Sequence, residues 1–158
     1  MERIPSKYIP IVKKALIASA SVAPLGLLGG WDAAAIATIW TTMFIAIREK
    51  GNSSLGKDPK RIALAVATGL IKYYIGCKAA TFACFCIPGL GPFVAIVAAI
   101  GISGVCNIYF TYSFAAALID LMNKNNYSDD DTIDTLIKLL KKLPNVDEVK
   151  EIAKIYKS

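Results

Sequence analysis

The sequence predicts an all-α protein: two apolar helical hairpins packed as a bundle, followed by a C-terminal amphipathic helical pair. Three observations predict it. First, 55% of the 158 residues are hydrophobic, and two long stretches carry almost no charge. Second, a turn rich in proline and glycine interrupts each stretch, and such a turn cannot continue a helix. Third, the C-terminal region has apolar residues at the three- and four-residue spacing of an amphipathic helix.

The first apolar stretch, residues 15–47, contains Asp32 as its only charged residue. Its Pro/Gly turn divides it, so we expect helices over 7–23 and 32–50. Asp32 directly follows the turn, where a carboxylate can accept hydrogen bonds from the first backbone N–H groups of a helix. We therefore interpret Asp32 as an N-cap, and the alternative is a counter-charge for Lys78 in the second hairpin.

The second apolar stretch, residues 79–119, has no charged residue and is interrupted by the turn at 87–92. We expect helices over 59–86 and 92–122. Pro59 suits the start of the earlier one, because the first turn of a helix does not need its N–H. A polar loop between the two hairpins separates them.

Two lysines, Lys72 and Lys78, lie inside the expected helix 59–86. A lysine at mid-bilayer costs about 2.5–3.5 kcal/mol, less where the side chain reaches the interface. Lys78 is close enough to the turn to reach that side. Lys72 would need a partner, a cavity or a shallower insertion of the helix.

A stripe of small residues predicts that the third and fourth helices pack closely. Small residues at four-residue spacing let two backbones approach, in a membrane or in a soluble bundle. The seam comprises Gly69, Gly76, Ala80, Gly91, Ala95, Ala99 and Ser103.

Apart from Lys72 and Lys78, the basic residues lie in three segments: before the first hairpin, between the hairpins and after the second. Neither turn carries one, although the net charge is +6. The positive-inside rule expects this distribution if the hairpins enter a bilayer, with the basic segments and termini facing the cytoplasm. A soluble bundle also keeps charges at its ends, so a cytoplasmic location stays open. The Ala-rich stretch after the first basic residues is too weakly hydrophobic for a cleaved signal.

The composition changes near residue 124, which divides the chain into a bundle, 1–123, and a tail, 124–158, packing on or beside it. Ser128 can cap a helix whose first turn carries three aspartates, a favourable arrangement against the helix dipole. Pro144 ends this helix, and Asn145 can cap a last short one.

The polar residues do not indicate an enzyme, and we expect no cofactor and no metal. Histidine is absent, and the apolar segments offer no nucleophile–base pair or carboxylate pair. The cysteines Cys77, Cys84, Cys86 and Cys106 lie in apolar sequence without metal-site spacing and are expected to be reduced and structural.

The loop at 51–58 matches the first seven positions of a phosphate-binding loop. Asp58 occupies the eighth position, where a hydroxyl is needed, and the loop follows an expected helix rather than a strand. We interpret it as a linker. Nucleic acid is not expected as a partner, because the aromatic residues lie in or beside apolar runs rather than among exposed basic residues.

Three segments carry a resemblance to known protein families. They are the apolar turn with Asp32, the helix ending at 49–51, and the run 87–93 with the Ala-rich helix after it, which contains Gly101 and Gly104. These segments resemble the GTPase-associated, YcjF-like helical membrane domain of unknown function. They are also similar to the helical domain of the interferon-inducible immunity-related GTPases. The resemblance implies a membrane protein that works with a GTPase. This chain has no GTPase module, so the partner would act in trans.

Three functional hypotheses follow. The first is a non-enzymatic, membrane-associated helical adaptor or scaffold that contacts anionic lipid and a cytoplasmic partner, for which the resemblance suggests a GTPase. The second is a pore-forming or toxin-like protein that inserts its apolar hairpins. The third is a soluble helical scaffold. Homo-oligomers are compatible with each.

Overall fold

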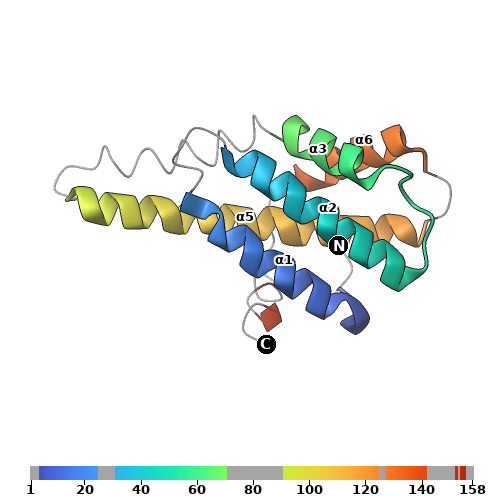
Figure 1. The fold of residues 1–158 in the computed structure, drawn as a ribbon, viewed down its shortest axis with the longest axis horizontal. Helices are drawn as coiled ribbons and strands as arrows, with labels where there is room; N and C mark the ends of the chain where they lie inside the picture. The colour runs from blue at the N-terminus through green and yellow to red at the C-terminus, as the bar shows by residue number, and fades with distance from the viewer. Residues whose placement is uncertain are drawn as a thin grey trace.

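The structure is a computed structural model that describes residues 4–24, 31–70, 91–124 and 127–141, together with Ile152, Lys154 and Ile155. These residues form helices and the turns between them, and no strand occurs among them, which confirms the all-α class (Figure 1). The elements are a 3-10 helix η1 (Ser6–Tyr8), α1 (Ile9–Ser21), α2 (Trp31–Gly51), α3 (Pro59–Gly69), α5 (Pro92–Met122) and α6 (Asp129–Leu140).

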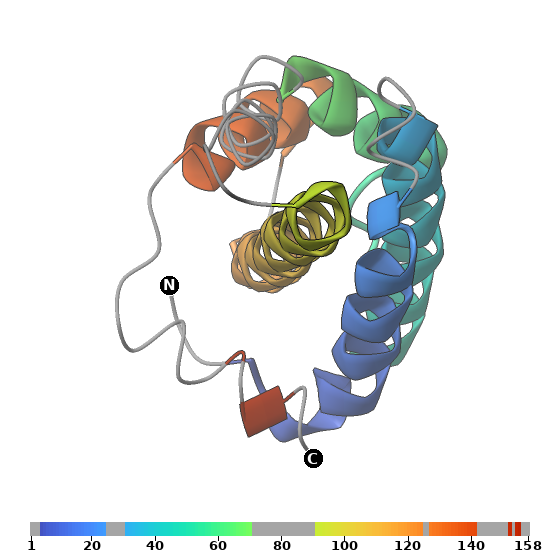
Figure 2. The ribbon, with the colours of Figure 1, turned by 90° about the vertical axis from the view of Figure 1, so that its left-hand side faces the viewer.

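The helices are arranged around α5 (Figure 2). Neighbours in the surrounding layer follow the order α1, α2, α3, α6, and α1, α2 and α6 also pack directly on α5. The described part of α3 packs mainly on α2 and α6. The expected pairing of the helix after Pro59 with the helix at 92–122 stays a prediction, because residues 71–90 lie outside the described part of the chain.

The helix that begins at Pro59 is shorter than expected, because α3 ends at Gly69 rather than near residue 86. Asp58 caps its start by accepting a hydrogen bond from the Arg61 N–H. Glycine is the weakest helix former after proline, and here it is followed by Leu70, whose fully buried side chain anchors the turn. Residues 71–90 lie outside the described part of the chain.

Aromatic residues from α2 and α5 form the centre of the core. The Trp40 and Phe114 rings stack with centroids 4.6 Å apart, and Phe44 meets Phe114 edge-on at 6.3 Å. All three side chains are fully buried. Aromatic pairs of this kind add about 0.5–1.5 kcal/mol beyond the burial of their area. They fix α5 against α2.

The tail begins with α6, which contributes to the same core. Leu136 and Leu140 are buried, and α6 packs on α3 and α5. The Ser128 hydroxyl accepts a hydrogen bond from the Asp131 N–H, and the Asp131 carboxylate accepts one from the Ser128 N–H. Together the two bonds form a capping box. Ile155 is also buried in the core, and most of the expected last helix lies outside the described residues.

Candidate functional site

The described helices place their ends at two opposite ends of the molecule (Figure 1). The C-terminus of α1 and the N-termini of α2 and α5 lie toward one of them. The C-termini of α2 and α5 and the N-termini of α3 and α6 lie toward the other. We call residues 92–102 of α5 the apolar end. The charged end is defined by Arg48, Lys50, Lys57, Lys60, Arg61 and Lys124.

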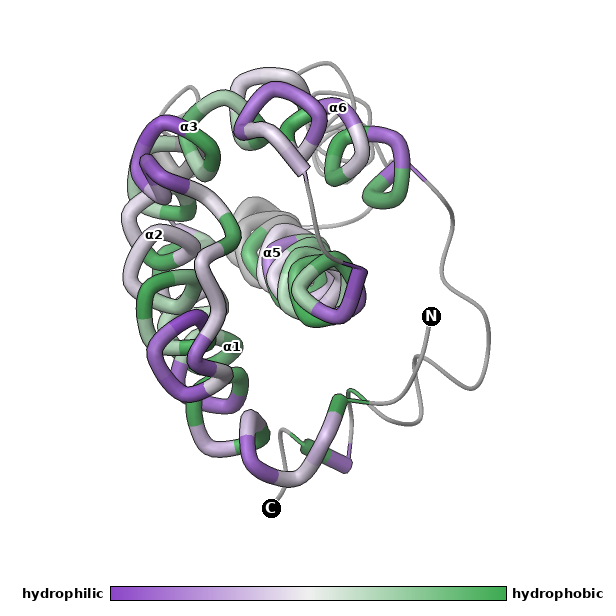
Figure 3. Tube along the Cα trace, turned by 90° about the vertical axis from the view of Figure 1, so that its right-hand side faces the viewer, coloured by the Kyte–Doolittle hydropathy of each residue, from purple (hydrophilic) through white to green (hydrophobic). Residues whose placement is uncertain are grey.

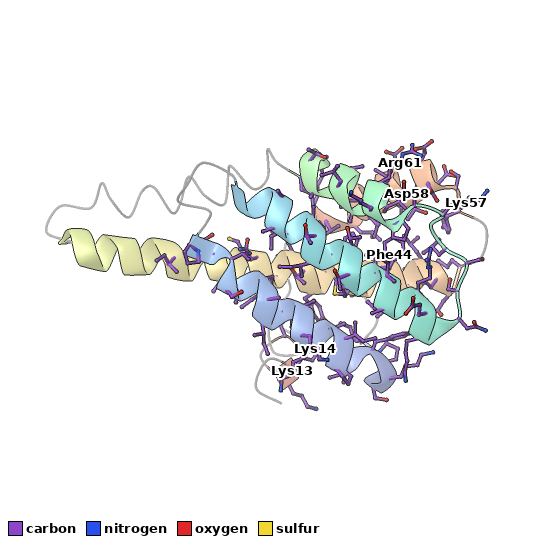
Figure 4. All side chains as sticks on the ribbon, viewed as in Figure 1. Lys13, Lys14, Phe44, Lys57, Asp58 and Arg61 are labelled. Atoms are coloured by element: carbon purple, nitrogen blue, oxygen red, sulfur yellow. The ribbon has the colours of Figure 1, made fainter. Side chains whose placement is uncertain are left out.

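The charged end combines basic residues from the loop and helices at 48–61 with Lys124 after α5. Seen from this end, hydrophilic segments lie on α3, α6 and the end of α5 (Figure 3). Lys57 and Arg61 lie there, whereas Lys13 and Lys14 lie midway along α1 (Figure 4). The first basic segment therefore extends along the flank of the bundle.

The first part of α5 projects beyond the other described helices (Figure 1). The helix has 31 residues, which corresponds to about 46 Å. A Cβ on Gly104 would be 3.6 Å from that of Ala23, at the end of the α1 contact. Gly101, farther toward the N-terminus of α5, is exposed, and Val105, the residue after Gly104, is 67% exposed. Every residue from 92 to 102 is apolar.

The rest of α5 is a core helix in this conformation. One segment of the described residues, Ser103–Met122, is long and apolar enough to cross a membrane, by length and composition only. Most of it is buried in the bundle, as in the central helix of a soluble protein. Among the described residues of α5, the exposed ones, Gly101 and Val105, lie in its N-terminal half.

A polar stripe on α5 faces α1 and α2 inside the bundle. Ser103, Asn107 and Thr111 recur every four residues, and all three are buried. Asn107 donates its Nδ2–H to the Ser19 carbonyl at 3.1 Å. Thr111 Oγ1 accepts from Trp40 Nε1 at 2.9 Å. Among the described residues, the Ser103 hydroxyl has no hydrogen-bond partner.

At the charged end, the loop between α2 and α3 binds a carboxylate of the tail. The backbone N–H groups of Lys57 and Asp58 donate to the two oxygens of Asp129, at 2.9 and 3.2 Å. The side chain of Arg48 donates to the Gly56 carbonyl at 2.7 Å. The loop resembling a phosphate-binding loop thus follows the helix α2, and two of its N–H groups hold the start of α6.

A polar cleft of about 500 Å³ opens beside this contact. It lies between the loop at 53–57, the end of α5 and the start of α6, and both signs of charge line it, including Lys57, Lys124 and Asp130. Arg61 and Asp130 form an ion pair at 2.5 Å. No group of three or more acidic, cysteine or histidine side chains that could hold a metal occurs within the described ranges.

Asp32 is not the N-cap that the sequence suggested. The helix α2 includes Trp31, so Asp32 lies within its first turn. The Asp32 side chain, and all of Lys72 and Lys78, lie outside the described part, so the proposed ion pair stays a prediction.

The small-residue seam is only partly described. Gly69 faces α6 rather than α5, because a Cβ there would lie 2.5 Å from Ile137 Cδ1. A Cβ on Gly91 would meet nothing within 4 Å among the described atoms. Ser103 is buried in the bundle. The other members, Gly76, Ala80 and the side chains of Ala95 and Ala99, fall outside the description.

Sequence reasoning missed the contacts made by Asp129 and by Thr111. Asp129 was assigned only to the first turn of its own helix, and its partners are 71–72 residues away in sequence.

Comparison of the chain with known protein families, curated proteins and solved structures found no match.

Proposed function

We propose that this protein is a non-enzymatic, membrane-associated helical adaptor whose apolar end enters a lipid bilayer while its charged end stays in water. The observation that carries the proposal is the projection of residues 92–102, all apolar, at the end of the bundle opposite the charged end. An apolar helix end of this kind loses unfavourable contact with water when it enters lipid.

The length of the projection favours a shallow insertion. Residues 92–102 extend about 16 Å along the helix, and the hydrocarbon core of a bilayer is about 30 Å thick. The projection therefore reaches about halfway across. The α3 and α6 helices carry exposed charged residues such as Arg61 and Lys138, which keeps that part of the bundle out of the hydrocarbon.

In this orientation the charged end lies in water, where a partner protein can reach it. Along α5 it lies about 30 Å beyond residue 102, whereas the Debye length at physiological salt is about 8 Å. The basic residues there would be screened from the surface of the same membrane. The partner suggested by the resemblance to the YcjF-like domain is a GTPase acting in trans, at the polar cleft beside Asp129.

Vesicle flotation tests the proposal. The wild-type protein should float with phosphatidylcholine vesicles, and added phosphatidylserine should strengthen binding less than about tenfold, because the basic end is distant. Ile96→Asp should weaken binding by at least about tenfold, since a charge in hydrocarbon is costly. Leu64→Asp, at an exposed position on α3, is the control and should bind as wild type. Equal binding by both variants, or no flotation, would contradict the proposal.

Pore formation is the second candidate, and the polar stripe on α5 favours it. Buried serine, asparagine and threonine side chains on an otherwise apolar helix could face one another, or water, after the helices insert. The same vesicles, loaded with a self-quenching dye, distinguish the candidates. The adaptor binds without releasing the dye, whereas a pore-former releases it.

A further inference from the structure

An apolar groove lies on the outer side of α1 and α2, about halfway along the bundle. Its volume is about 360 Å³, within the range of about 300–1,000 Å³ typical of small-molecule sites. Small side chains leave the space between larger ones. The apolar lining comprises Ile11, Ala15, Ala18, Ile39, Met43 and Ala46.

Among the described residues, the groove offers one charged group to a ligand. Lys14 is exposed at its edge on α1 and is the charged residue among those that line it. Two hydroxyls also line the groove, but both donate to carbonyls of their own helix: Thr38 to Ala34 at 3.0 Å and Thr42 to Thr38 at 3.1 Å. Their donor capacity is therefore used, and the Lys14 ammonium is the available polar donor.

We propose that this groove binds a long-chain fatty acid, with the carboxylate at Lys14 and the acyl chain along the apolar floor between α1 and α2. A single cation beside an apolar channel is complementary to an amphiphile with one negative charge at one end. The site is distinct from the apolar end of α5, so it does not depend on the proposed membrane insertion.

Titration with a fatty acid carrying a dansyl group at the end of its chain, below its micelle concentration, tests the site. Wild type should bind it saturably. Lys14→Gln should weaken binding about tenfold, because the charge-assisted hydrogen bond is lost. Lys13→Gln removes the neighbouring lysine, which does not line the groove, and should bind as wild type. A fatty alcohol of equal length should compete equally well for wild type and Lys14→Gln.

Ala18→Phe and Ala46→Leu test the floor of the groove. Both positions are partly exposed, so a larger side chain can occupy the groove without entering the core. Each variant should lose saturable binding while keeping the helical circular dichroism and vesicle flotation of wild type. No saturable binding by wild type, or wild-type affinity in Lys14→Gln and both filled variants, would overturn the proposal. Loss of flotation in Ile96→Asp does not bear on this site.

Discussion

Gly56 determines the geometry of the loop between α2 and α3. Its φ is +74°, a left-handed conformation that residues with a side chain rarely adopt. A Cβ at this position would lie 2.6 Å from Phe44 Cζ and 2.9 Å from Ile62 Cδ1. Both atoms belong to fully buried side chains of the core, so neither can move away easily. The carbonyl of the same residue accepts the hydrogen bond from Arg48.

We predict that Gly56→Ala lowers the free energy of unfolding by about 1–3 kcal/mol, through backbone strain and the contact with Phe44. Gly101→Ala is the matched control. Gly101 is an exposed residue inside α5, and a Cβ there would meet nothing within 4 Å among the described atoms. That change should raise stability by about 0.5–1 kcal/mol, because alanine is the better helix former. Urea unfolding of both variants measures the difference, and equal effects would refute the explanation.

At the scale of single residues, the sequence predicts the role of a side chain well where its hydrogen-bond partners are close in sequence. Ser128 was predicted as a cap and acts at the start of α6, next to the N–H group that it serves. Asp32 shows how one residue of error at a helix boundary changes the interpretation, since the helix begins before it. The bond between Trp40 and Thr111 spans 71 positions, and nothing in either local sequence indicates it.

At the scale of elements, α6 is joined to the bundle by two polar contacts of different strength. Asp129 is partly buried and receives two backbone N–H groups from the loop. The ion pair between Arg61 and Asp130 is exposed, with side-chain exposures of 55% and 77%. Hydrogen bonds to a carboxylate contribute about 1.5–3 kcal/mol when partly shielded, and exposed ion pairs about 0–1 kcal/mol.

Asp129→Ala should therefore destabilise the protein by about 1–3 kcal/mol, whereas Arg61→Ala should cost less than about 1 kcal/mol. Hydrogen exchange locates the effect: the amides of Lys57 and Asp58 should exchange faster in Asp129→Ala and remain as in wild type in Arg61→Ala. The reverse order of stabilities would mean that the ion pair, and not the loop, holds α6.

The starts of α3, α5 and α6 could be predicted because proline or a capping residue marks each one. The end of α3, and the helices on which α3 packs, could not be predicted. The stretch from Pro59 reads as one long apolar helix, and the local sequence does not indicate that Leu70 is buried or that Gly69 lies against Ile137 of α6. The small-residue pattern likewise predicts close packing without identifying the partner helix.

At the scale of the whole molecule, the sequence predicted the separation of charge from the apolar turns, and the described helices bring six of the twelve described basic residues to one end. The length of α5 then relates that separation to a bilayer. At about 46 Å, the helix is as long as a bilayer with its headgroups is thick, about 40–45 Å. Shallow insertion and complete insertion therefore place the charged end in different surroundings.

A fluorescent label at each end distinguishes these orientations. In a background without the four native cysteines, single cysteines replace Ile96 at the apolar end and Ser54, an exposed residue of the charged end, and each is labelled with NBD. We predict that vesicles shift the emission of the label at 96 to the blue, because it enters hydrocarbon, and leave the label at 54 unchanged, because it stays in water. A shift at both positions would indicate that the bundle lies flat or inserts completely. A shift at neither would support the soluble scaffold.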